Sequence, residues 1–107
     1  MNGILKPRMA YKVTFTARSQ NDLKSILNDG LGRYTPAQSL GYIQGMRRKC
    51  ELLDVFPKRS TALLVRGKEY WRLTFKAHNI YYQVDDQEEH VFVVAILHNR
   101  MQFEARL

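Results

Sequence analysis

The fold is decided by one stretch near the C-terminus, Val91–Leu97, which reads VFVVAIL. Apolar side chains occupy both its odd and its even positions, so a strand formed here is buried on both faces. A strand of this kind belongs in the interior of a sheet. The acidic segment Asp85–Glu89 precedes it and predicts a hairpin loop from another strand over residues 79–84. The sequence therefore predicts a sheet organised around its C-terminal third.

Shorter segments with a period of two extend this sheet. Residues 62–65 and 70–75 are candidate strands joined by a turn at 66–68, and a tight bend at 76–78 leads into the next strand. Near the N-terminus, Tyr11, Val13 and Phe15 alternate with polar residues, which is the pattern of a half-buried strand. Because helical segments separate this first strand from the others, we expect it to lie beside the last strand.

The clearest helix begins at the sequence Thr35-Pro-Ala-Gln38. Thr35 is suited to the N-cap, Pro36 to the first helical position, and the Gln38 side chain to a reciprocal bond with the cap. Apolar residues then recur at spacings of three and four, at Leu40, Ile43, Met46, Cys50 and Leu53. Pro57 ends this pattern, since the residue before a proline avoids helical geometry.

An earlier helix is predicted from Ser19, which resembles an N-cap with Asp22 three residues later. Leu23, Ile26 and Leu27 form its apolar stripe, which stops near Gly30 and Gly32. Together the two helices make a helical hairpin.

Gly41 and Gly45 are spaced one turn apart in the second helix. A glycine inside a helix costs about 1 kcal/mol relative to alanine, so the pair predicts a close approach of another backbone. We expect that neighbour to be the first helix.

The order of strand, two helices and then three or four strands predicts an α+β domain. We expect an antiparallel sheet of four to five strands with the N-terminal helical hairpin packed on one face. A chain of 107 residues suits one domain. We assign that domain to residues 10–107, preceded by an N-terminal extension at 1–9, with Met9 as an alternative start of translation.

Positive charge is concentrated in the N-terminal part. The formal net charge is +7, and residues 1–60 contain 11 Lys and Arg against 4 Asp and Glu, whereas the remaining residues are balanced. This excess favours an anionic partner, either a nucleic acid or an acidic protein. The alternative is that the basic residues only keep a small domain soluble.

Most catalytic and metal-binding patterns are absent from the sequence. It contains neither a glycine-rich phosphate loop nor a serine-hydrolase elbow. The histidines lie near strand ends without a second cysteine nearby, so no metal or other cofactor is expected. Cys50, the single cysteine, falls on a helical apolar stripe and is predicted to be a buried structural thiol, typical of a reducing compartment such as the cytoplasm. The longest apolar run is too short to cross a membrane.

One group of residues suggests chemistry on RNA. Arg72, Tyr82, His98 and Arg100 come from neighbouring predicted strands or their ends. On a shared face, the arginines would stabilise a charged phosphorane while His98 or Tyr82 moved a proton. The alternative is that Arg72 is an ordinary cross-strand partner and His98 a strand-end residue.

Three segments resemble the RelE/ParE toxin superfamily, and within it the ParE branch. Residues 13–23 (VTFTARSQNDL) are similar to the opening strand and first helix, and residues 78–84 (HNIYYQV) to the penultimate strand. Residues 93–101 (VVAILHNRM) are similar to the ParE ending, in which Leu-His and one variable residue precede Arg-Met or Arg-Arg. The resemblance spans about residues 10–101.

The resemblance implies the toxin of a bacterial toxin–antitoxin pair. ParE-like members poison DNA gyrase by binding, whereas RelE-like members cleave mRNA in the ribosome and usually carry a tyrosine close to the C-terminus, which residues 99–107 lack. We therefore expect a non-enzymatic gyrase inhibitor, with Arg72, His98 and Arg100 as target contacts. In the alternative, a RelE-type ribonuclease, the same three residues are the catalytic candidates. A basic nucleic-acid-binding module without toxicity is the third possibility.

The resemblance also implies an antitoxin partner, a ParD-like or other small acidic protein that folds over the helical hairpin and sheet edge. Arg47, Arg48 and Lys49 are the candidates for pairing with its acidic side chains. Their alternative role is that of a solvated helix face. Operator DNA would be contacted only through the toxin–antitoxin complex, and no membrane is involved.

Overall fold

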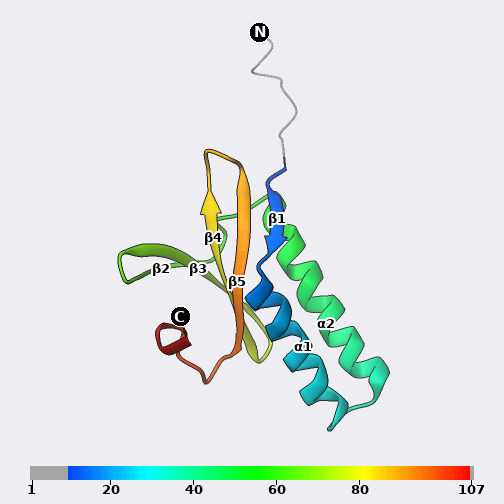
Figure 1. Ribbon diagram of the computed structural model, residues 1–107. Helices are drawn as coiled ribbons and strands as arrows, with labels where there is room; N and C mark the ends of the chain where they lie inside the picture. Colours follow the sequence, from blue (N-terminus) through cyan, green and yellow to red (C-terminus); the bar gives the residue numbers. More distant parts are fainter. Residues whose placement is uncertain (1–9, 107) are drawn as a thin grey trace.

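The computed structural model describes residues 10–106 and shows a helical hairpin packed on one face of a five-stranded sheet (Figure 1). The predicted extension at 1–9 and the alternative start at Met9 lie outside the described residues. The predicted α+β class is confirmed.

The elements follow the predicted order. They are β1 (Lys12–Phe15), α1 (Ala17–Leu31), α2 (Pro36–Glu51), the 3₁₀ turn η2 (Leu52–Asp54), β2 (Thr61–Val65), β3 (Lys68–Phe75), β4 (His78–Asp85), β5 (His90–His98) and the 3₁₀ turn η3 (Phe103–Arg106). The strand order across the sheet is β1-β5-β4-β3-β2. The prediction that the first strand lies beside the last is confirmed. The sheet is mixed rather than wholly antiparallel, because β1 crosses over through the helical hairpin and pairs parallel to β5.

The strand β5 is an interior strand, as predicted, and a bulge explains its apolar pattern. Tyr81 pairs with Ala95 while Tyr82 pairs with Val93, so β5 has one extra residue at this point. Val93 packs in the core beneath the helices, whereas Val94 and Ala95 both pack in a second core on the outer face. The bulge therefore reverses the inward and outward alternation halfway along the strand.

The start of α2 is confirmed and the start of α1 differs from the prediction. Thr35 accepts the Gln38 N–H, and the Gln38 side chain accepts the Thr35 N–H. The N-cap of α1 is Thr16 rather than Ser19, because the Thr16 hydroxyl accepts the backbone N–H of Ser19. Ser19 is itself buried and donates its hydroxyl to the Thr16 carbonyl.

The predicted stripe of α2 and its glycine pair need correction. Ile43, Met46, Cys50 and Leu53 are buried, whereas Leu40 is exposed. The close neighbour of Gly45 is a sheet residue rather than α1, since a Cβ there would lie 3.0 Å from Phe75 Cζ. No atom lies within 4 Å of the same position on Gly41. The tight helix–helix contact instead joins Gly30 to Ser39, whose Oγ would be 2.7 Å from an added Cβ.

The C-terminal tail covers part of the sheet face opposite the helices (Figure 1). Phe103 of η3 is buried against Tyr70 and Tyr81, while Arg66 donates to the Glu104 carbonyl. The tail after β5 thus contributes to a second core.

Candidate functional site

The predicted group of Arg72, Tyr82, His98 and Arg100 is not assembled on one face. Arg72 is exposed on β3 opposite Tyr81, on the face away from the helices. Tyr82 is fully buried beneath the helices, with its Oη 2.6 Å from Ser60 Oγ. The expectation that these residues share one face was wrong, because strand alternation turns Arg72 and Tyr82 to opposite sides of the sheet.

The other two members of the predicted group lie at the end of β5. His98 pairs with His78, which contacts α2, so His98 lies on the helix side of the sheet. Arg100 is exposed in the turn beyond the strand. The bulge in β5 shifts the parity of His98 relative to the start of the strand, and the sequence pattern alone gives no position for that bulge.

The outer sheet face around Arg72 is polar. Thr61 lies beside Arg72 on β2, and Tyr81 lies on its other side on β4. Thr74 Oγ1 donates to Asn79 Oδ1 at 2.9 Å. A permanently charged arginine among hydroxyl and amide groups can bind an anion or an acidic side chain, but it cannot move a proton.

A second polar constellation, which sequence reasoning missed, joins α2 to the end of the sheet. Tyr42 Oη lies 2.7 Å from His78 Nδ1, and the His78 and His98 rings are 5.5 Å apart. Burial lowers the pKa of His78, and His98 lowers it further. Burial also disfavours the charged form of Tyr42, which raises the pKa of its phenol. The only sequence signal was that both histidines stand at the ends of adjacent predicted strands.

A groove of about 850 Å³ opens beside this constellation, between the helical hairpin and the end of the sheet. We call it the hairpin–sheet groove. Its lining includes Ser39 and Tyr42 from α2, His78 and His98 from the sheet, and Lys76 from the β3–β4 turn. Lys76 Nζ also lies 5.7 Å from the centre of the Tyr42 ring. The groove therefore combines aromatic, hydroxyl, imidazole and cationic groups.

The basic residues predicted to bind an antitoxin are divided around α2. Arg47 lies over the Phe15 ring of β1, at 5.0 Å from its centre. Arg48 is exposed and Lys49 is half-buried. Exposed Leu40 and Leu52 lie near the two ends of the same helix. The helix thus presents both apolar and cationic groups to solvent.

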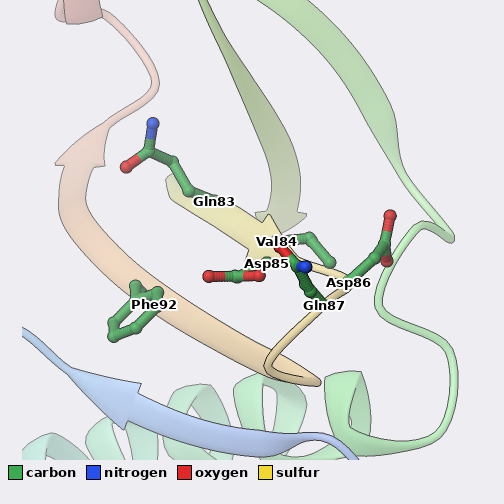
Figure 2. Close-up of a pocket in the computed structure, with 6 residues that line it drawn as sticks. All are labelled: Gln83, Val84, Asp85, Asp86, Gln87 and Phe92. Carbon is green, nitrogen blue, oxygen red and sulfur yellow. The ribbon is translucent and has the colours of Figure 1, made fainter.

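A depression of about 500 Å³ lies at the β4–β5 hairpin and is lined by Gln83–Gln87 and Phe92. Figure 2 shows these side chains. Asp86 accepts hydrogen bonds from Lys58 and from Tyr11, and the Lys58 contact holds the pKa of Asp86 below its usual range. These bonds tie the residue before β1 and the segment before β2 to the hairpin. This carboxylate is engaged in a structural contact.

Cys50 is fully buried, and burial raises the pKa of its thiol to about 12. The prediction that this thiol is buried is confirmed. Within residues 10–106, no cluster of three or more metal-ligating side chains occurs, and no helix has the length and hydropathy needed to span a membrane.

A comparison with protein-family models identifies the family of this chain. The family model described as the ParE toxin of the type II toxin–antitoxin system parDE matches residues 13–103. The chain belongs to the ParE toxin family. The resemblance seen in the three sequence segments is thereby confirmed. A search of curated protein sequences finds no match.

Three of the solved structures that share this fold belong to toxin–antitoxin systems. The chromosomal ParDE system of P. aeruginosa matches with a TM-score of 0.68 and 15% identity, covering 83% of this chain and 96% of that one. The RelBE2 complex of Mycobacterium tuberculosis matches with a TM-score of 0.65 and 17% identity, covering 87% and 95%. The RelE–RelB complex of Pyrococcus horikoshii OT3 matches with a TM-score of 0.64 and 13% identity, covering 87% and 100%.

Proposed function

We propose that this ParE-family toxin inhibits DNA gyrase by direct binding and catalyses no reaction itself. The match of the ParE family model over residues 13–103 carries the proposal. The RelE-type alternative, ribosome-dependent mRNA cleavage, shares the same fold.

The surroundings of Arg72 favour inhibition by binding over RNA cleavage. Metal-free cleavage needs groups that move protons at the 2′-hydroxyl and the leaving oxygen, and such transfer typically contributes ~10²–10⁴-fold. Tyr81 is the titratable residue paired with Arg72, and its ring is buried beneath Phe103. His98, the predicted acid or base, lies on the other side of the sheet. Binding to a protein surface makes no demand for proton transfer.

We assign the target contact to the outer sheet face at Arg72 and to Arg100 in the turn after β5. Both side chains are exposed, and both carry charge at any physiological pH. His98, the third predicted target contact, lines the hairpin–sheet groove instead. A partner that reached all three residues would have to wrap around the end of β5.

The antitoxin is proposed to be a small acidic protein, ParD-like or similar, encoded beside the toxin. Arg48, with Arg47 and Lys49, would pair with its acidic side chains, while exposed Leu40 and Leu52 would receive apolar anchors. The net charge of +7 supports a partner of opposite sign. The complex would act in the cytoplasm and contact operator DNA only through the antitoxin.

The two surfaces can be tested by separate variants. Arg72→Gln should weaken gyrase inhibition about tenfold, the equivalent of one lost charge-assisted contact, while Lys68→Gln on the same strand serves as the charge-matched control. Arg48→Glu should weaken capture of the neighbouring gene product, with Lys24→Glu on α1 as its control. If Arg72→Gln and Lys68→Gln reduced gyrase inhibition equally, a specific contact at Arg72 would be ruled out.

A further inference from the structure

The strand β2 forms an open edge of the sheet. It is the last strand in the sheet order, and it pairs with β3 alone (Figure 1). The opposite edge is β1, where Arg47 of α2 lies over the Phe15 ring. The α2 surface assigned to the antitoxin therefore adjoins β1, at the other side of the sheet from β2. An edge strand presents a row of N–H and C=O groups to which another strand can add.

The two edges differ in how they are protected. At β1, the Tyr11 N–H donates to the Asp54 carbonyl at 2.8 Å, and the Gln20 side chain donates to the Phe15 carbonyl at 2.9 Å. Among residues 10–106, no group outside β3 hydrogen-bonds to the backbone of β2. Its sequence, TALLV, contains no charge and no proline, and its pairing with β3 has no bulge. These are the features that natural proteins use to block an edge.

The turn after β2 determines which backbone groups face outward. Arg66 and Gly67 have φ values of 53° and 79°, which is the type I′ turn of a two-residue hairpin. The residues on either side of it, Val65 and Lys68, therefore exchange both of their backbone hydrogen bonds. From this pair onward, hydrogen-bonded and non-hydrogen-bonded pairs alternate along the two strands.

Two residues of β2, Ala62 and Leu64, fall at the non-hydrogen-bonded positions. Leu64 lies opposite Glu69, whose carbonyl accepts the Gln83 side chain of β4 and so faces away from β2. The N–H and C=O of Leu64 accordingly face away from β3, and those of Ala62 do the same. Both side chains are exposed, and Leu64 is 75% exposed.

This edge is complementary to a second copy of itself. When two β2 strands meet antiparallel about a twofold axis at Leu63, Ala62 of each copy lies opposite Leu64 of the other. Each of these pairs exchanges two backbone hydrogen bonds, so all of the outward groups are used. A register shifted by two residues in one direction places Ala62 opposite Arg66, which is in the turn with φ of 53°. A shift in the other direction places Leu64 opposite Ser60, outside the strand.

The side chains suit the same register. On one face, Leu64 lies against the small Ala62 side chain of the other copy. On the other face, Leu63 meets its own copy, and because Leu63 packs on the outer core, the outer cores of the two molecules become continuous. Arg66 lies opposite Ser60, so no like charges stand directly opposite each other.

The small size of this contact determines its strength. Two strands of five residues bury less than the roughly 1,000 Å² that stable interfaces exceed. The net charge of +7 on each copy adds a repulsion that salt screens. The expected complex is a weak dimer that salt strengthens, whereas the binding of an acidic partner would be weakened by salt.

We propose that the β2 edge is a self-association surface, to which a second copy of this chain adds its own β2 in antiparallel orientation, centred on Leu63. The two sheets become one continuous sheet. Pairing at an edge leaves both sheet faces open, so Arg72 stays accessible on the outer face. The dimer does not rest on gyrase being the target.

The first experiment measures sedimentation velocity of the full chain from micromolar to millimolar concentrations, at low and high salt. Leu64→Lys should weaken the dimer about tenfold or more, because it replaces a buried apolar contact by a charge. Leu31→Lys makes the same change at an exposed position on α1 and should have no effect. Ala62→Pro should also weaken the dimer, since it removes an outward N–H without removing a bond to β3. Thermal unfolding confirms that each variant is folded.

The second experiment tests the register by cross-linking. Leu63→Cys places two thiols at the twofold axis, in a non-hydrogen-bonded pair whose Cα atoms would be about 4.5 Å apart, within the range of a disulfide. Leu64→Cys places its two thiols on a diagonal, farther apart, although residue 64 is the more exposed. Oxidation should therefore link Leu63→Cys faster than Leu64→Cys on a non-reducing gel. Cys50 is buried in both variants.

The proposal is supported by a dimer that salt strengthens, that Leu64→Lys weakens and that Leu31→Lys leaves unchanged. A chain that stays monomeric at millimolar concentration in high salt would overturn it. So would equal weakening by Leu64→Lys and Leu31→Lys, because that result indicates general charge repulsion. Faster cross-linking of Leu64→Cys than of Leu63→Cys would contradict the pairing centred on Leu63.

Discussion

The ring of Phe103 is stacked on that of Tyr81 with centroids 4.1 Å apart and an angle of 8° between the planes. Phe103 also meets Tyr70 edge-on at 4.9 Å, so it fills the centre of the outer core. The tail of the chain is therefore part of the folded domain, although its sequence is largely polar.

Phe103→Ala should lower the free energy of unfolding by about 3 kcal/mol or more, which is typical for a buried phenylalanine. Urea denaturation measures this value. Met101→Ala, at an exposed position in the same tail, should cost much less. Equal losses for the two variants would mean that the tail is not packed on Tyr81.

The two glycines of α2 form a matched pair. Gly41→Ala should stabilise the protein by up to about 1 kcal/mol, because alanine is the better helix former and the position is open. Gly45→Ala should stabilise the protein less than Gly41→Ala does, or destabilise it, because the new Cβ would lie 3.0 Å from Phe75 Cζ. Thermal unfolding of both variants checks the difference. A larger gain at Gly45 than at Gly41 contradicts the packing of α2 on β3.

Cys50 should be unreactive in the native protein, because its thiol is buried and its pKa is raised to about 12. A thiol reagent at neutral pH should modify it only after denaturant is added. Cys50→Ser should destabilise by about 1–3 kcal/mol, since it buries a hydroxyl in an apolar site. Fast modification of the folded protein would place the thiol at the surface.

The stability of the protein should fall as the pH drops below about 6.5, the ordinary pKa of histidine. The pKa of His78 is lower in the folded state than in the unfolded chain, so the unfolded chain binds more protons in this range. The contribution is fully present above the unfolded pKa and is lost on acidification. His78→Asn should reduce this slope in a series of thermal unfolding curves. An unchanged slope would show that His78 is not the group responsible.

Much of the fold could be predicted because its signals are local. The capping box at Thr35 and the apolar pattern of Val91–Leu97 each depend on residues close in sequence. The candidate site depends instead on which face of a strand each side chain occupies. For His98, one bulge near Ala95 determines which face of the sheet the side chain occupies. No residue in the sequence marks the position of that bulge.

The same limit applies to contacts between elements. Gly45 signalled a close approach, but whether its neighbour was α1 or Phe75 depends on how α2 lies on the sheet. The contact between Tyr42 and His78 joins residues that are 36 positions apart in sequence. Such pairs appear only when the helical hairpin is docked.

The central claim is that this toxin acts on gyrase rather than on mRNA. The most direct measurement incubates the purified toxin with gyrase, plasmid DNA and ATP, and in parallel with ribosomes translating a defined mRNA. We predict toxin-dependent loss of supercoiling or accumulation of cleaved plasmid, with the mRNA intact. Codon-phased cuts in the mRNA, with gyrase unaffected, would contradict the account.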